Sequence, residues 1–223
     1  LRFFRFHARF GGGGPDAASL SACQARANDL MALSRERIAM ELLALLALPN
    51  PAPTLALMIE SGIFTPVLPE VTDAAPVARL VVREAEAGIA PDALRRLCAL
   101  IAPDPIVAED IANRLKLSNA QRKRMIAVAA RAAEDASAPR ALAYWQGVEV
   151  AIDRLLLGNG DPRPLMDWTP PRFPINGGAI VARGVQAGPE VARILQSAER
   201  QWVAEGFHEA ARAEAIVAAL IPA

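Results

Sequence analysis

Lysine is nearly absent from this chain of 223 residues, in which Lys116 and Lys123 are the only two. Arginine therefore carries almost all of the positive charge, and its planar guanidinium group suits phosphates and base edges. A genomic bias toward arginine codons would give the same composition. The 24 basic and 24 acidic residues balance to a formal net charge of zero. Any nucleic-acid site must therefore be a local patch, because no overall field favours a polyanionic partner.

Cysteine and histidine are equally scarce, with two of each. Cys23 and Cys98 are too few for a disulfide framework or a zinc site, and we expect both to be buried thiols in a reducing cytoplasm. His7 and His208 lie in no cluster with metal-ligand spacing. We therefore expect no metal site, no cofactor and no histidine-based catalytic triad in this chain.

Long apolar runs are also missing. The richest one, Ile38 to Leu48, is interrupted by Glu41 and falls short of the roughly 18 residues that a membrane span needs. We expect a soluble, cytoplasmic protein with no membrane partner. Aromatic residues make up 5% of the chain against 53% hydrophobic residues overall. The core must then be built mainly from Ala, Leu, Ile and Val, a mixture that favours closely packed helices.

Prolines and glycines divide the chain into short segments with helical periodicity, and no period-two strand pattern persists. We expect an all-α fold of about ten helices in two sub-bundles, without a sheet, joined near residue 70 or 135. The run Gly11 to Gly14 before Pro15 predicts a flexible joint. A phosphate-binding glycine loop is the alternative, but no strand precedes the run and no Lys-Ser/Thr pair follows it.

Helix boundaries follow from capping residues and breakers. Helix starts are predicted at Asp16, Ser34, Asp73, Pro91, Asp104 and Ser118. One longer helix is predicted over 139–157, and the last two over 189–205 and 208–220.

Arginines and phenylalanines alternate through the first ten residues. Arg2, Arg5 and Arg9 recur at spacings of three and four, which places them on one face of a helix beside the phenylalanines. Guanidinium groups on such a face can bind phosphates in bidentate fashion. A solvated stripe next to a core stripe would produce the same spacing.

The segment SRERIAMEL (34–42) carries Glu36 in the first turn of a predicted helix, where the helix dipole favours a carboxylate. Arg37 and Glu41 stand at i and i+4, so the spacing predicts a helix-stabilising ion pair between them. This motif is expected to be architectural.

The densest basic cluster brackets the helix start at Ser118. It comprises Arg114, Lys116, Arg122, Lys123 and Arg124. A phosphate at that N-terminus would meet free backbone donors together with cationic side chains. No aromatic residue interleaves these charges, so a solvated face is the competing interpretation.

Three segments carry a resemblance to a known family. LRFFRFHARF (1–10), SRERIAMEL (34–42) and FPINGGAIVARGVQAGPEVARILQSAERQWVAEGF (173–207) resemble, in this order, segments of the bacterial CCA-adding tRNA nucleotidyltransferases and poly(A) polymerases. The resemblance implies a neck-like region over 1–70, a body-like region over 71–135 and a tail-like region over 136–223. It also implies that the catalytic head, with its metal-binding carboxylates and Mg²⁺, lies outside this chain.

Function and site residues follow from the resemblance. In the family, the tRNA 3′ hydroxyl attacks the α-phosphate of CTP or ATP, and the helical part holds the tRNA. Arg2 and Arg5 match arginines that help to hold the nucleotide, and Glu36, Arg37 and Glu41 match the ERxxxEL motif that steadies the neck. Arg9 and the basic cluster are the RNA-binding candidates. This chain alone is expected to be inactive and to bind tRNA rather than DNA.

Two other functions fit the same helices. A poly(A) polymerase shares them, and the residues that separate the two activities lie mostly in the head. A helical scaffold that binds a protein through its Ala/Leu faces is the alternative from a different class.

Overall fold

Helices make up the regular structure of the computed structural model, which describes residues 1–11 and 14–221. Within these residues there are thirteen α-helices and three 3₁₀ helices, and no strand. The predicted all-α class is confirmed, with more and shorter helices than expected. Gly12 and Gly13, at the centre of the predicted glycine joint, lie outside the described residues.

Most of the α-helices follow one another with short connections. Their bounds are α1 Arg2–Phe10, α2 Ala17–Ala25, α3 Arg35–Leu46, α4 Ala52–Glu60, α5 Ala75–Glu86, α6 Ala93–Ala99, α7 Pro105–Arg114, α8 Asn119–Ala129, α9 Pro139–Gln146, α10 Val148–Leu157, α11 Gly177–Val181, α12 Pro189–Ala204 and α13 Ala210–Leu220. The 3₁₀ helices are Ala27–Ala32, Ala133–Ser137 and Arg163–Leu165.

Capping residues begin most of the predicted helices. The side chains of Asp16, Ser34, Asp104 and Ser118 each accept a hydrogen bond from a backbone N–H in the first turn, and Ser118 forms a complete capping box with Gln121. These four starts are confirmed, because each side chain satisfies a donor that the helix leaves free.

Two starts are shifted by one or two residues. Asp92 rather than Pro91 caps α6, accepting from the backbone N–H of Arg95 at 2.8 Å. Ahead of α5, Asp73 accepts from the N–H of Ala75 at 2.8 Å, while Ala74 is the N-cap residue.

The single helix predicted over 139–157 is wrong. Gly147 ends α9 and begins α10, and its φ of +86° lies in the left-handed region. Glycine adopts that conformation without the steric cost that a side chain would bring. The chain therefore changes direction where periodicity alone predicted continuity.

Buried hydrophobic side chains form three clusters. The largest runs from Phe4 in α1 to Leu156 in α10, and it crosses both positions at which we expected the sub-bundles to join. A small cluster lies between α9, α10 and Leu165, and a third joins Ile175 to α11, α12 and α13. The division into regions 1–70, 71–135 and 136–223 stays a prediction.

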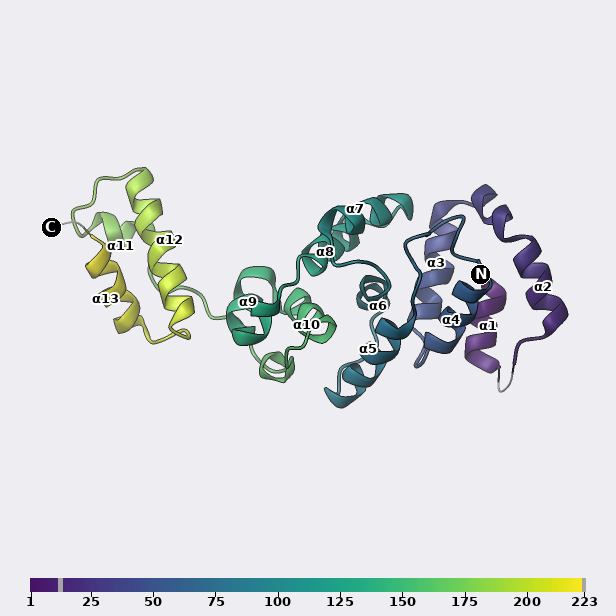
Figure 1. Cartoon of the computed structure of the whole chain (residues 1–223). Coiled ribbons are helices and arrows are strands. Elements are labelled where there is room, and N and C mark those ends of the chain that lie inside the picture. Colours follow the sequence, from purple (N-terminus) through teal and green to yellow (C-terminus); the bar gives the residue numbers. More distant parts are fainter. Residues whose placement is uncertain (12–13, 222–223) are drawn as a thin grey trace.

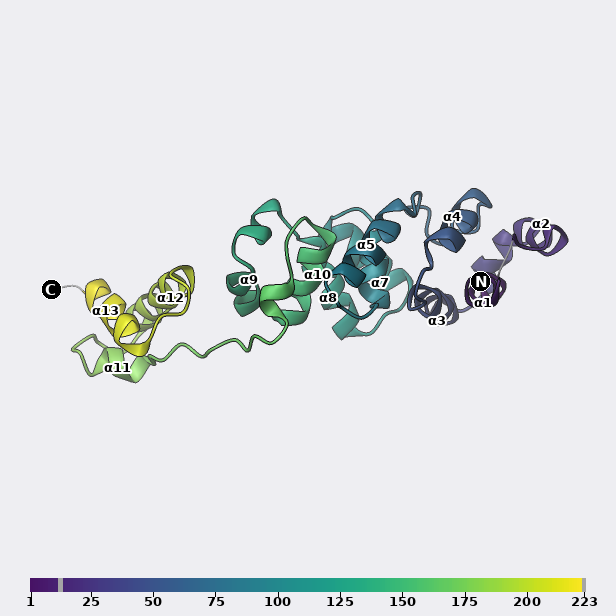
Figure 2. The same ribbon diagram turned by 90° about the horizontal axis from the view of Figure 1, so that it is seen from below.

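Groups of helices follow one another along an elongated molecule (Figure 1). Helices α1–α4 lie at one end and α11–α13 at the other, with α5–α10 between them. Residues 168–176 contain no helix and form an extended connection to the C-terminal helices, which Figure 2 shows clearly. The break between helical units therefore falls in this proline-containing segment.

A buried ionic network joins the central helices. Glu84 of α5 accepts hydrogen bonds from Arg95 and Arg96 of α6, and Asp153 of α10 accepts from Arg95 and from Arg124 of α8. The two carboxylates are 2% and 0% exposed. Each charge is paired, which is the condition for keeping charged groups inside a core.

The two cysteines differ in environment. Cys98 of α6 is buried, and desolvation raises its pKa to about 12. Cys23 of α2 is only half-buried, so the prediction that both thiols are buried is wrong for this residue.

Among the described helices, none combines the length and the apolar character that crossing a lipid bilayer requires.

Candidate nucleic-acid interface

Helix α1 presents arginines and phenylalanines on a shared exposed face. The guanidinium carbons of Arg2 and Arg5 lie 5.4 and 5.0 Å from the ring centre of Phe6, and that of Arg9 lies 5.3 Å from the ring centre of Phe10. Phe6 is 42% exposed and Phe10 is 69% exposed. Cation–π contacts of this kind contribute about 0.5–1 kcal/mol each at exposed sites.

The core side of the same helix is formed by a different phenylalanine. Phe4 is buried, and Phe3 packs edge-on against it with ring centres 5.1 Å apart. The sequence interpretation of separate cationic and aromatic stripes is therefore wrong in part, because Phe6 and Phe10 lie among the arginines. Flat guanidinium groups and exposed rings together form a surface on which bases can stack and phosphates can bind.

Arg5 joins this face to the ERxxxEL motif. Its Nε atom donates a hydrogen bond of 2.7 Å to Oε2 of Glu41 in α3, and both side chains are about one-fifth exposed. The predicted pair between Arg37 and Glu41 is wrong: Arg37 is exposed, and Glu41 bonds across to α1 instead. The motif therefore fixes α1 against α3 and orients one of the two candidate nucleotide-binding arginines.

Coupling between Arg5 and Glu41 can be measured by a double-mutant cycle. For Arg5→Gln and Glu41→Gln we expect a coupling free energy of unfolding of about 1 kcal/mol, since the pair is charged, hydrogen-bonded and partly shielded from solvent. Urea unfolding of the four proteins gives this value. The control cycle combines Arg2→Gln with Glu41→Gln and should show coupling near zero, and equal values in both cycles would contradict the assigned pair.

Glu36 connects the start of α3 to the basic cluster. Its Oε1 lies 3.2 Å from Nζ of Lys116, and both side chains are more than half exposed. A backbone hydrogen bond at its own N–H, followed by the interaction with Lys116, lowers the pKa of Glu36. Lys116 adopts a left-handed φ of +52° between α7 and α8, which directs the chain back along α7.

Most members of the basic cluster are engaged by carboxylates. Arg114 bonds Glu70 at 2.8 Å, and this hydrogen bond lowers the pKa of Glu70 and raises that of Arg114. Arg122 forms an ion pair with Glu109. The cluster is therefore much less positive than its sequence suggests.

Arg124 points into the buried network rather than outward. It lies 2.7 Å from Asp153, 3.1 Å from Asp92 and 2.8 Å from Glu149. Burial opposes its charge, yet these carboxylates raise the pKa of Arg124 above its ordinary value. Lys123 is the exception, because no carboxylate of the described residues lies within ion-pair distance of it.

The structure thus brings together some candidates and separates others. Arg2, Arg5 and Arg9 share a face of α1 with Glu41 behind it, and Glu36 meets Lys116. Their roles in binding stay predictions. Across residues 1–11 and 14–221, no group of three or more His, Cys, Asp or Glu side chains is arranged to hold a metal ion. The Mg²⁺ implied by the resemblance therefore has no ligand set among these residues.

Comparison with known families adds one finding. Residues 15–75 match a family model described as "Probable RNA and SrmB- binding site of polymerase A". The match relates the chain to the poly(A) polymerase and CCA-adding enzyme family. It covers α2, α3 and α4 and ends at the first residue of α5, so it includes Glu36, Arg37 and Glu41. No curated protein matched the chain.

The match supports the assignment of residues 15–75 as an RNA-binding helical module of a nucleotidyltransferase family. Helix α1, with Arg2, Arg5 and Arg9, precedes the matched residues and contacts them through the Arg5–Glu41 bond. Helix α1, which carries the exposed arginine and phenylalanine face, therefore packs directly against the region that the family description associates with RNA.

Proposed function

We propose that this chain is the tRNA-binding helical portion of a CCA-adding tRNA nucleotidyltransferase. The observation that carries the proposal is the match of residues 15–75, which encloses the ERxxxEL motif bonded to Arg5. The polymerase would add CTP- and ATP-derived nucleotides to the tRNA 3′ end through a catalytic head implied by the resemblance. A cytoplasmic location is part of the same proposal.

The residues of this chain would act by holding RNA and orienting the nucleotide. Arg2 and Arg9 offer exposed guanidinium groups that can bind phosphates, while Phe6 and Phe10 offer rings for stacking. Arg5 is held by Glu41, so its position toward a nucleotide would be fixed before binding. Such contacts do not read base sequence, which suits a partner recognised by its shape and backbone.

The second candidate is addition of A residues alone. The description of the matching family names polymerase A, which favours this function over that of a protein-binding scaffold. Incubating the complete enzyme with tRNA transcripts that lack CCA, and with CTP and ATP separately and together, distinguishes the two. Incorporation of C before A supports CCA addition, and growth of an A tail with ATP alone supports the second candidate.

RNA binding is tested with the chain itself by fluorescence anisotropy against deacylated tRNA. Across roughly 50 to 300 mM salt, we expect the logarithm of the affinity to fall linearly with the logarithm of the salt concentration, because phosphate contacts release counterions. A DNA hairpin of similar length should compete poorly. Absence of binding at the lowest salt concentration would contradict the proposal.

The face of α1 is tested by the double variant Arg2→Gln/Arg9→Gln. Loss of two exposed cations from the binding surface should weaken tRNA binding roughly tenfold and reduce the salt slope by about 1 to 2. The control is Arg183→Gln/Arg200→Gln, which removes the same charge from two exposed arginines in the C-terminal part of the chain. Equal losses in the two double variants would assign the effect to net charge alone.

A further inference from the structure

A cavity of about 380 Å³ lies between α5, the connection from α6 to α7, the segment after α8 and the end of α10. Among the residues that the structure describes, its lining contains Arg79, Arg83 and Arg131 together with Asn159, and no carboxylate. The volume is ample for a phosphate group with its ester substituents. Three cations without an acidic residue are unusual in a chain whose other arginines are so often paired.

Within the described part of the chain, every hydrogen-bond partner of the Arg83 side chain is a backbone carbonyl group. Its guanidinium donates hydrogen bonds to the carbonyl oxygens of Leu155 at 3.2 Å, Leu156 at 2.8 Å and Gly160 at 2.6 Å, and also to that of Gly158. These dipoles fix the side chain and satisfy the last carbonyls of α10. They do not cancel its unit charge, so the wall that it forms stays positive.

Arg131 follows α8 and is half-buried. The one hydrogen bond of its guanidinium group within the described residues is a long one of 3.5 Å to the carbonyl of Val128, and none of their carboxylates lies within ion-pair distance. The nearby Asp135 is already bound by Arg154, with both carboxylate oxygens accepting at 2.8 Å. Burial lowers the pKa of Arg131. Holding this cation away from water without a partner is unfavourable, and a bound anion would offset that cost.

Arg79 is the third arginine that lines the cavity, and it lies on the side that faces solvent. It stands one helical turn before Arg83 on α5, and its side chain is exposed without an ion-pair partner among the described residues. Arg131 also lines a second cavity of about 260 Å³, which shares Pro103, Gly158 and Asn159 with the first. The cationic site is therefore open to solvent at Arg79, and beyond Arg131 it adjoins this second cavity, whose lining includes Asp135 and its partner Arg154.

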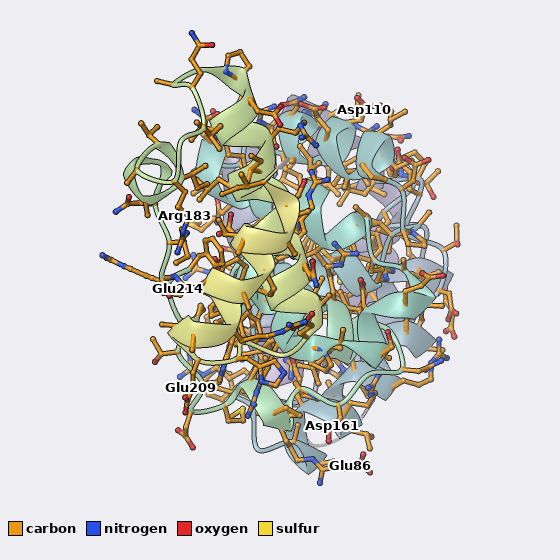
Figure 3. The ribbon with its side chains drawn as sticks, turned by 90° about the vertical axis from the view of Figure 1, so that its left-hand side faces the viewer. Glu86, Asp110, Asp161, Arg183, Glu209 and Glu214 are labelled. Carbon is orange, nitrogen blue, oxygen red and sulfur yellow. The ribbon has the colours of Figure 1, made fainter. Side chains whose placement is uncertain are left out.

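Acidic residues gather at a neighbouring cavity instead. Glu86 and Asp161 line it together with Arg83, and Figure 3 shows them near one another at the same edge of the molecule. Asp161 is engaged by Arg163 at 2.9 Å. A phosphate entering this region would therefore be directed to the Arg79 and Arg131 side, where no carboxylate lines the cavity.

We propose that the cavity lined by Arg79, Arg83 and Arg131 is a phosphate-binding site that takes a backbone phosphodiester of the bound RNA. This inference rests on the proposed RNA-binding function. Arg131 and Arg79 would bind the phosphate oxygens through their planar N–H groups, and Arg83, fixed by carbonyls, would supply charge without moving. The site lies outside the residues that match the family model.

The experiment compares three proteins: the unaltered chain, the variant Arg79→Gln/Arg131→Gln, and the control Arg183→Gln/Arg200→Gln with the same loss of charge. Anisotropy with deacylated tRNA should show roughly tenfold weaker binding for the cavity variant and a salt slope smaller by about 1 to 2. The control should bind as the unaltered chain does. A fourth protein, Arg131→Lys, keeps the charge but not the guanidinium fork, and should lose part of the affinity.

A second measurement uses inorganic phosphate as the probe. Phosphate at millimolar concentration should raise the unfolding temperature of the unaltered chain and of the control, and should leave that of the cavity variant unchanged, relative to chloride at equal ionic strength. Circular dichroism checks that each variant is folded. If phosphate stabilises the chain while tRNA binds the cavity variant normally, the site takes free phosphate and the assignment to RNA is overturned.

Failure of the site and failure of the function give different results. Strong tRNA binding that is equal in all three proteins, with no phosphate effect, overturns the site and leaves the proposed function standing. No tRNA binding by the unaltered chain overturns the function and with it the assignment to RNA, while the phosphate measurement still reports whether the cavity binds an anion.

Discussion

Replacing Glu84 with Gln is expected to lower the free energy of unfolding by about 3–5 kcal/mol. Oε1 of Glu84 accepts from Arg95 at 2.7 Å, and Oε2 accepts from Arg96 at 2.9 and 2.7 Å. The substitution removes the charge and places amide donors against guanidinium donors. Arg96 would then remain 1% exposed without a carboxylate partner. For a chain of this size, the loss corresponds to a fall of roughly 6–20 °C in the unfolding midpoint.

The matched control for this prediction is Glu86→Gln on the same helix. Glu86 is exposed, so its substitution should change stability by no more than about 0.5 kcal/mol. Thermal and urea unfolding of both variants measure the difference. A Glu84→Gln variant that unfolds within about 1 kcal/mol of the unaltered chain would mean that the network contributes little beyond its own desolvation cost.

Replacing Trp202 with Ala is expected to destabilise the C-terminal helices by about 3–5 kcal/mol. Trp202 is 3% exposed, and its indole N–H donates to the carbonyl of His208 at 2.6 Å. Its ring packs against Phe173, Phe207 and Tyr144, with ring centres 5.2–6.1 Å apart. Removing it leaves a cavity and an unpaired carbonyl where α12, the turn after it and α9 meet.

Hydrogen exchange locates this effect along the chain. Because α11–α13 have their own hydrophobic cluster, exchange in α12 and α13 should accelerate by roughly 10²- to 10⁴-fold, while α3–α8 should exchange at an unchanged rate. Trp145→Ala is the control, since that ring is 48% exposed. Equal acceleration in α3–α8 would show that the whole chain unfolds as one cooperative unit. The extended connection would then not separate two independently unfolding units.

Local rules predicted much of the fold. The helix starts at Asp16, Ser34, Asp104 and Ser118 follow from side chains that accept hydrogen bonds from the first turn of their own helix. A few consecutive residues are therefore enough to predict each start. Gly147 shows where such rules stop. A glycine within an apolar periodic segment is compatible with a continuous helix, and the turn there depends on how α9 and α10 pack.

Charge partners were the least predictable feature. Spacing paired Glu41 with Arg37 on its own helix, whereas the structure pairs it with Arg5, which is 36 residues away. The basic run around Ser118 looked like a free cationic patch, but Glu70, Glu36, Glu109 and Asp153 reach it from other parts of the chain. Ion pairs between distant segments leave no periodic signal, so sequence counting overestimates exposed charge.

Some residues of the candidate sites were predictable from the sequence, and others were found only in the structure. The repeated arginines and phenylalanines of the first ten residues were visible in the sequence, and so was the ERxxxEL motif. Arg79 and Arg131 gave no signal, because 52 positions separate them and neither belongs to a recognisable motif. A helix face is visible in sequence because its period is fixed, whereas a cavity is assembled from unrelated segments.

The sequence by itself determined the all-helical class, most helix starts and the resemblance to a nucleotidyltransferase family, because these depend on composition, capping and local spacing. Tertiary structure alone decided which arginines are neutralised, which stay free and where they meet. The physical reason is range: capping acts within one helical turn, while ion pairing and burial depend on which helices the core brings together.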